Sequence, residues 1–427
     1  MKIFMRKVLA TAFVLAVGGS VHLAEGQDVR AFKRIQLNDQ FWSEGATFGD
    51  LNNDGVNDIV SGPWWWEGPE FAKRHEYYPA TTTFRLKLGP VTTVEVPGFE
   101  GALGKENKYS NNFFAFVHDF NGDRWNDILI IGFPGRDTSW FENPKGKDAH
   151  WVRHQIFDQT DNESPTFADL TGDGKPELVC ITKGRYGYAE PDWRDPSKPW
   201  QFHPISPDNK YGNFTHGMGL GDVNGDRRLD LLEKNGWWEQ PASLAGDPLW
   251  RFHKQPVGTG GSQMFAYDVN GDGLNDIITG LAAHEFGLAW YEQYRDGPEI
   301  RFREHIIMNR RPEDNAYGVK FSELHAIDLV DMDGDGLKDI VTGKRWFSHG
   351  MEYPENDRDD PPVVAWFKLA RLAGQRVDFI PHLIDDDSGV GTQVVVGDIN
   401  GDRLPDIVVG NKKGTFVHLH EKKSGSQ

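Results

Sequence analysis

Cysteine is almost absent from this sequence, because Cys180 is the only one among 427 residues. No disulfide can form within the chain, and Cys180 lies in an apolar run that predicts a buried thiol. Long apolar runs are also missing: beyond the N-terminus none reaches the roughly 18 residues that a membrane helix needs. A disulfide-stapled module is therefore excluded, and metal ions are the obvious alternative staple. No membrane span is expected beyond the N-terminus, where a retained anchor is the less favoured alternative.

The first 26 residues differ in character from the rest of the chain. Lys2, Arg6 and Lys7 precede an apolar run over residues 8–17, and small residues follow up to Gly26. This order is typical of a cleaved signal peptide. We therefore expect a signal peptide over 1–26, a secreted or periplasmic and soluble protein, and a monomer. We expect the tail, residues 422–427, to be disordered.

Positive charge is scarce, since 46 Lys and Arg stand against 64 Asp and Glu, for a net charge of −18. Many of the carboxylates fall in seven short acidic loops, described next. Bound divalent ions would neutralise much of this charge, so the acidity is explained by metal ligation. Such a chain lacks the basic surface that nucleic acid requires, and we expect no nucleic-acid partner.

One short pattern returns seven times, first at residues 50–60 and then from Asp119, Asp169, Asp222, Asp268, Asp331 and Asp398. Side-chain oxygens recur at positions 1, 3, 5 and 9, and position 7 would offer its carbonyl. Oxygen ligands in a flexible loop favour calcium, so we expect up to seven structural calcium ions. Position 12 of the first loop is Ser61 rather than Glu, which excludes an EF-hand. The predicted ligand side chains, loop by loop, are Asp50, Asn52, Asp54, Asp58; Asp119, Asn121, Asp123, Asp127; Asp169, Thr171, Asp173, Glu177; Asp222, Asn224, Asp226, Asp230; Asp268, Asn270, Asp272, Asp276; Asp331, Asp333, Asp335, Asp339; and Asp398, Asn400, Asp402, Asp406.

Three positions in these loops vary in an informative way. The third loop carries Thr171 and Glu177, so we expect the weakest calcium binding there. Arg124, Arg227 and Arg403 occupy position 6, where the other loops have glycine. If that position requires a left-handed backbone, these arginines carry strain.

The loops lie 46 to 69 residues apart, a period that suits a four-stranded blade of a β-propeller. We predict an all-β, seven-bladed propeller over residues 27–421, with each calcium loop between strands one and two of a blade. The N-terminal strand, residues 32–37, would complete the last blade and remove both sheet edges. The segments 68–110 and 344–362 are longer than a blade needs and are predicted to hold insertions.

The repeats resemble the FG-GAP and VCBS repeats of propellers such as the integrin α N-terminal domain. The resemblance rests on Asp-x-Asn-x-Asp-Gly-x-x-Asp-Ile after a strand of small and apolar residues, as at residues 50–59. It implies a calcium-bound propeller but no single activity, because such propellers include adhesion modules, polysaccharide lyases and sugar dehydratases.

Functional residues are expected at the end of the blades opposite the calcium loops, where the copies differ. The residues six positions before the first Asp of each loop are, in order, Glu44, Phe113, Glu163, His216, Ser262, His325 and Thr392. Two carboxylates and two imidazoles here could act as acid and base, or hold one further divalent ion in the central channel. Tyr109 approaches the same face, so the candidate catalytic residues are His216, His325, Glu163, Glu44 and Tyr109. Substrate-binding candidates from the ends of strand two are Trp64, Lys183, Arg185, Lys234, His284, Lys344 and Arg345.

The leading hypothesis is a carbohydrate lyase or dehydratase with a His and Glu site at the channel mouth. The starts at residues 215–217 and 323–325 look similar to those of aldos-2-ulose-dehydratase-type propellers. Two alternatives stay open: a non-catalytic glycan-binding or adhesion propeller, and a hydrolase that uses Glu44 and Glu163. The Trp and His residues that recur in most units are predicted to pack the blades rather than to form a site.

Overall fold

The computed structural model describes residues 31–80, 83–87, 90–97, 109–349, 357 and 359–421. The predicted signal peptide and the C-terminal tail fall outside these ranges, as do residues 350–356 and 358 of the segment 344–362. The described chain is built of β-strands with one short 3₁₀ helix, Pro312–Asp314. Over these residues, no helix has the length and apolarity to traverse a lipid bilayer.

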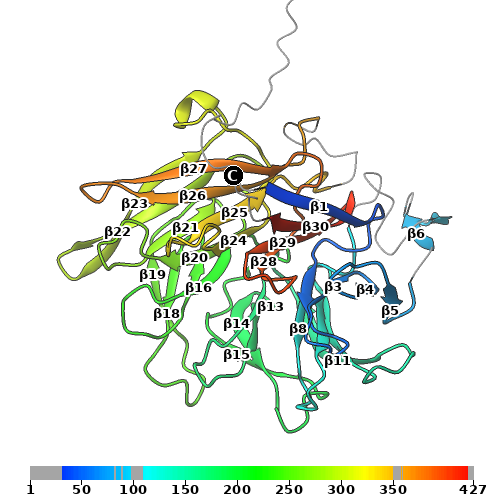
Figure 1. Cartoon of the computed structure of the whole chain (residues 1–427). Helices are drawn as coiled ribbons and strands as arrows, with labels where there is room; N and C mark the ends of the chain where they lie inside the picture. Colours follow the sequence, from blue (N-terminus) through cyan, green and yellow to red (C-terminus); the bar gives the residue numbers. More distant parts are fainter. Residues whose placement is uncertain are drawn as a thin grey trace, which may run out of the picture.

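Five four-stranded antiparallel sheets stand as separate blades around a ring (Figure 1). In chain order their strands are β2 (Thr47–Gly49), β3 (Asp58–Ser61), β4 (Trp64–Trp66) and β5 (Arg74–Glu76); β8 (Phe114–His118), β9 (Asp127–Ile131), β10 (Arg136–Glu142) and β11 (Val152–Thr160); β12 (Thr166–Ala168), β13 (Glu177–Thr182), β14 (Arg185–Glu190) and β15 (Gln201–Pro204); β24 (Ile327–Val330), β25 (Asp339–Gly343), β26 (Val364–Arg371) and β27 (Val377–Asp385); and β28 (Val394–Gly397), β29 (Asp406–Asn411), β30 (Gly414–Glu421) and β1 (Ala31–Asn38).

The prediction of seven separate blades is wrong, because the two remaining repeats share one sheet of eight strands. Its strands are β16 (Met218–Gly221), β17 (Asp230–Glu233), β18 (Gly236–Glu239), β19 (Arg251–Lys254), β20 (Gln263–Tyr267), β21 (Asp276–Gly280), β22 (Leu288–Asp296) and β23 (Glu299–Met308). The two innermost strands, β16 and β20, pair in parallel, with Gly219 opposite Met264. A side chain at Gly219 would lie 1.8 Å from the Met264 carbonyl oxygen, so glycine permits this close approach.

The ring is closed by the N-terminal strand, as the sequence predicts. Strand β1 pairs antiparallel with β30, with Ile35 opposite Val417. The inner strand β2 of the first sheet contacts both β8 of the next sheet and β29 of the last. A separate hairpin, β6 (Thr83–Lys87) and β7 (Thr93–Pro97), lies within the segment 68–110 that was predicted to hold an insertion.

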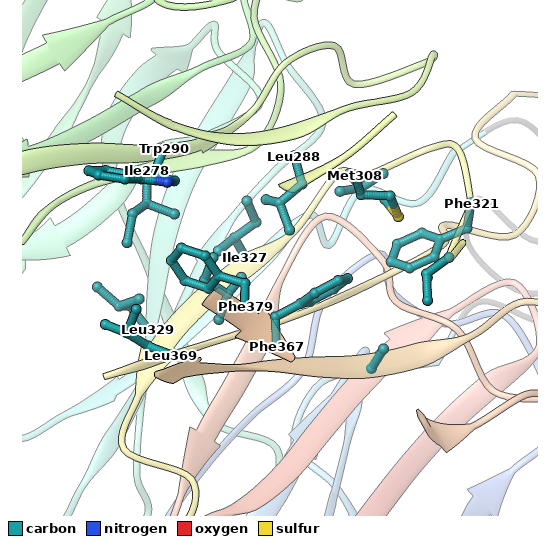
Figure 2. Close-up of a cluster of buried hydrophobic side chains, with 14 of the residues drawn as sticks. Ile278, Leu288, Trp290, Met308, Phe321, Ile327, Leu329, Phe367, Leu369 and Phe379 are labelled. Atoms are coloured by element: carbon teal, nitrogen blue, oxygen red, sulfur yellow. The ribbon is translucent and has the colours of Figure 1, made fainter. Parts of the chain in front are cut away.

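The core is distributed between neighbouring units rather than gathered at one centre. Figure 2 shows one such layer, in which Ile278 and Trp290 of one unit lie opposite Ile327 and Phe367 of the next. Burial of a side chain of this size stabilises the fold by about 1.5–3 kcal/mol. Cys180 is fully buried in a similar layer, which confirms the prediction of a core thiol.

The repeated tryptophans and histidines stack on each other within single blades. Trp237 and His253 face each other across β18 and β19 with ring centroids 4.0 Å apart. The Nε2 atom of His253 lies 2.6 Å from Glu239 on the neighbouring strand. The same arrangement occurs at Trp65 and His75 with Glu67. The tryptophans also pack between blades as predicted, because Trp237 lies in a buried cluster with Met264 and Tyr291 of the next repeat.

Each acidic loop is held by hydrogen bonds from its own backbone. In the fifth loop, the Asp276 carboxylate at position 9 accepts the N–H groups of Val269 and Gln293 at 2.9 and 2.7 Å. Burial raises the pKa of Asp276 to about 7 despite these two donors. Position 6 has a positive φ in every loop, 84° at Gly273 and 71° at Arg227, which confirms the strain expected of the arginines.

Candidate functional site

The residues before the inner strands meet at the end of the ring opposite the acidic loops. Backbone hydrogen bonds join these strand starts to neighbouring segments: the Glu44 N–H donates to the Asn112 carbonyl at 2.9 Å, and the Glu163 N–H donates to the Thr215 carbonyl at 3.0 Å. The predicted residues Glu44, Glu163 and His325 are all at least nine-tenths buried. This end of the propeller is therefore a closed, polar assembly rather than an open channel wall.

Arg345 joins two of the predicted carboxylates. It follows β25, and its side chain is only 1% exposed. Its Nη2 atom donates to Glu44 Oε2 at 2.7 Å, and its Nη1 atom lies 3.8 Å from Glu163 Oε2. The sequence suggested Arg345 as a substrate ligand, but a buried guanidinium shared between two carboxylates is placed to hold them in position.

Three imidazoles converge beside this ion-pair network. His216 precedes β16, His284 follows β21 and His325 precedes β24. One ligand atom from each lies within 4.8 Å of the others. The ring centroids are 5.1 Å apart for His216 and His284, 5.6 Å for His216 and His325, and 4.5 Å for His284 and His325. We refer to these three side chains as the histidine cluster.

Two buried carboxylates back the histidine cluster. Glu163 Oε2 lies 3.3 Å from His216 Nε2, and Glu323 Oε2 lies 3.3 Å from His284 Nδ1. Glu323 also accepts a hydrogen bond from Ser348 Oγ. The Glu323 backbone adopts a φ of 62°, and its carbonyl accepts the N–H groups of His325 and Arg345 at 2.9 Å each. Glu323 thus contacts four members of the site at once: His284, Ser348, His325 and Arg345.

Burial and neighbouring charges set the protonation of this assembly. Burial would raise the pKa of Glu163, but His216, Arg345 and His284 outweigh it and hold that pKa at about 2. Burial lowers the pKa of His325 well below its usual range, and Arg345 adds to the effect. Glu163 is therefore an ionised carboxylate and His325 a neutral imidazole at ordinary pH.

An aromatic surface leads away from the histidine cluster. His349 lies against His284 with ring centroids 4.4 Å apart, and Tyr109 is 6.2 Å from His349. Phe133 follows at 4.8 Å from Tyr109, and Phe214 at 5.5 Å from Phe133. Phe214 is 50% exposed, so this row of rings connects the buried site with solvent. We call Tyr109, Phe133 and Phe214 the aromatic shelf.

The remaining predicted substrate residues make other contacts. Trp64 stacks on Arg74, whose guanidinium is 3.8 Å from the ring centroid. Lys344 is buried and donates from Nζ to Ser322 Oγ at 3.0 Å, next to Glu323 in the chain. For Trp64, Lys183, Arg185 and Lys234, no hydrogen bond, ion pair or ring contact with the histidine cluster is found in the described parts of the chain.

Three residues of the site were given no role from the sequence: Glu323, Ser348 and His349. Residues 323–325 were noted only as a strand start similar to those of dehydratase-type propellers, although the pair Glu-x-His was an available signal. Ser348 and His349 lie in the long segment after Arg345, which carries no repeat pattern. Their position depends on how that segment folds back over the end of the ring.

Two segments of the chain match known repeat families. Residues 119–180 match the FG-GAP-like repeat, and residues 390–423 match the FG-GAP repeat. The resemblance to FG-GAP repeats is therefore confirmed, and the all-β propeller fold agrees with it.

Several solved structures are similar over most of the chain. The WD40 domain of SCAP from fission yeast is 13% identical with a TM-score of 0.39, over 91% of this chain and 98% of that one. The BP39L lectin from Burkholderia pseudomallei is 13% identical with a TM-score of 0.43, over 92% and 97%. The exotype rhamnogalacturonan lyase YesX is 12% identical with a TM-score of 0.43, over 88% and 71%. Identities and TM-scores this low establish no shared activity.

Proposed function

We propose that this protein is a carbohydrate-active enzyme that catalyses an elimination, as a lyase or a dehydratase. The observation that carries the proposal is the convergence of His216, His284 and His325, from three different repeats, beside the buried carboxylates of Glu163 and Glu323. Such a concentration of buried polar groups is costly to a fold and is typical of reaction centres.

An elimination needs three chemical parts. A base removes a proton from the carbon next to a carboxylate or carbonyl, and that electron pair forms a carbon–carbon double bond. The carbon–oxygen bond to the leaving group breaks, and the leaving oxygen takes up a proton. A polarising group must stabilise the negative charge that develops on the carboxylate or carbonyl oxygen. No oxidant or reductant is required.

The site offers a residue for each part. The histidine cluster supplies the polarising group, and Glu163 and Glu323 orient two of its imidazoles. His349, against His284 on the side of the aromatic shelf, is assigned to remove the proton. Tyr109, the next ring outward, is assigned to protonate the leaving oxygen. Arg345 is a positioning residue that holds Glu44 and Glu163.

The aromatic shelf favours a carbohydrate as the substrate. Sugar rings have an apolar face that packs on aromatic side chains, while their hydroxyls and carboxylates need polar partners. Here the exposed ring of Phe214 and the inner ring of Tyr109 lead directly to imidazoles and carboxylates. A hydrolase that uses Glu44 and Glu163 is less well supported, because both carboxylates are engaged with Arg345.

The proposal is tested by incubating the purified protein with uronate-containing polysaccharides and keto-sugars, and following the new double bond by ultraviolet absorbance. His349→Gln and Tyr109→Phe are expected to lower kcat by about 10²–10⁴-fold, as the loss of a general acid or base does. Arg185→Gln is the matched control, because Arg185 was also predicted as a site residue but has no contact with the histidine cluster among the described residues.

A second candidate function is a non-catalytic glycan-binding propeller, which the half-exposed Phe214 favours. Binding of a glycan to the wild type without any unsaturated product, and unchanged binding by His349→Gln, would replace the elimination with this candidate.

We further propose that the acidic loops bind structural calcium and that the protein is exported. The seven loops repeat hard oxygen ligands in the same order, which is the chemistry that calcium selects. Export follows from the composition of residues 1–26. Calcium counting on the purified protein and N-terminal sequencing of the mature chain test the two statements.

A further inference from the structure

We propose that His216, His284 and His325 together bind one divalent ion of the zinc class at the end of the ring. The inference rests on the proposed function and deepens it, since the ion would be the polarising group of the elimination. The site is distinct from the acidic loops in position, ligand chemistry and burial.

The spacing of the three rings suits a common ion. A zinc–nitrogen bond of about 2.1 Å puts each ring centroid roughly 3 Å from the metal, so two rings of a tetrahedral set lie about 5 Å apart. The three observed centroid separations run from 4.5 to 5.6 Å. The rings meet at interplanar angles of 70–79°, so they converge edge-on and are not stacked as the repeated histidines are.

One nitrogen of the cluster lacks a hydrogen-bond partner. The Nε2 atom of His325 is buried without a partner, and His325 is only 2% exposed. A buried polar atom without a partner destabilises a fold, so such atoms are rare. His253, in contrast, has the Glu239 carboxylate 2.6 Å from its Nε2 atom. A metal ion would give the His325 nitrogen the partner that the protein does not supply.

The carboxylates behind the imidazoles match the usual surroundings of a metal-bound histidine. Such a histidine commonly donates its second ring N–H to a carboxylate, which fixes the ring and strengthens the ligand. Glu323 is placed for this role at His284, and Glu163 at His216. His284 is 37% exposed at its side chain and faces His349, which leaves the fourth coordination position on the side of the aromatic shelf.

Nitrogen ligands separate this ion from those of the loops. Imidazole suits zinc, copper, iron and nickel, whereas calcium takes oxygen ligands. Three protein nitrogens and one open position are the pattern of a catalytic zinc ion, which acts as a Lewis acid on a substrate oxygen.

The test uses the full chain, stripped with a chelator, returned to calcium and then titrated calorimetrically with Zn²⁺ alone. We expect one zinc ion per chain. Cobalt added in its place should give the visible absorption of a tetrahedral, nitrogen-ligated site. His284→Ala, the most exposed of the three, is expected to lose the zinc ion while its melting temperature in calcium stays near that of the wild type.

The matched control is His253→Ala, which removes a partly buried histidine of the repeated kind and should keep the zinc ion. Glu323→Gln should weaken zinc binding by about 10–100-fold, as the loss of an orienting carboxylate does. The inference is overturned if His284→Ala and His325→Gln bind as much zinc as the control. Zinc binding is measured without substrate. A protein that binds zinc but catalyses no elimination would therefore contradict only the proposed function.

Discussion

The two ends of the inner strands follow opposite rules. At one end, the acidic loops repeat the same residues, and their carboxylates accept hydrogen bonds from N–H groups of the same blade, as Asp276 does from Val269 and Gln293. At the other end the copies differ from each other, and Arg345 meets Glu44, which lies hundreds of residues away in the chain. A feature repeated in every blade stabilises the blade, whereas a feature that occurs once can take part in a reaction.

Removal of calcium should have the largest effect on stability, and it should act through the loop end of the strands. We expect a chelator to lower the melting temperature sharply, because each loop filled at 100 times its dissociation constant adds about 2.7 kcal/mol to the free energy of unfolding. Differential scanning calorimetry in calcium and in chelator measures the effect. Identical melting temperatures would show that the loops are held by their backbone hydrogen bonds alone.

Replacement of Arg345 by methionine should be the most damaging single change at the site end. It leaves Glu44 and Glu163 buried without their cation, at a cost of about 3–5 kcal/mol in the free energy of unfolding. Arg194→Met is the control, because its pair with Asp192 is exposed to solvent and should contribute little to stability. Urea unfolding compares them, and equal losses would refute the positioning role of Arg345.

The sixth acidic loop differs from the others because a lysine lies beside its carboxylates. Lys368 contacts Asp333 and lies 3.0 Å from Asp335, where five other blades have glutamate at the corresponding position. Lys368→Gln should raise the calcium affinity of this loop about five- to tenfold, equivalent to about 1 kcal/mol, by removing a competing ammonium. Calcium titration detects the change, with Lys198→Gln, from an exposed pair with Asp195, as the control. An unchanged affinity would mean that Lys368 moves aside without cost.

Gly273→Ala should have the smallest effect. Gly273 has a φ of 84° with open space around it, so the penalty is that of a left-handed backbone, about 1 kcal/mol. Gly212→Ala is the control, because its surroundings are equally open and its φ is not positive. Chemical unfolding measures both, and equal stabilities would remove the explanation given for glycine at position 6.

Counting back six residues from each loop was enough to predict which residues line the site end. Glu44, Glu163, His216 and His325 do meet there, because a strand of fixed rise places its start at a fixed distance from the loop. The same count gave no warning that Gly219 lets β16 pair with β20, since strand pairing between repeats depends on backbone approach. Nor could it find His349, which lies in a segment without a repeat.

The sequence by itself determined the repeat, the ends of the strands and the closure of the ring by β1, because these follow from local periodicity and from chain order. Only the tertiary structure decided the partners of the buried charges. Whether Arg345 faces substrate or Glu44, and whether His284 joins His216 and His325, depends on the angle at which one blade packs on the next. That angle is set by side-chain packing between blades, which no single repeat contains.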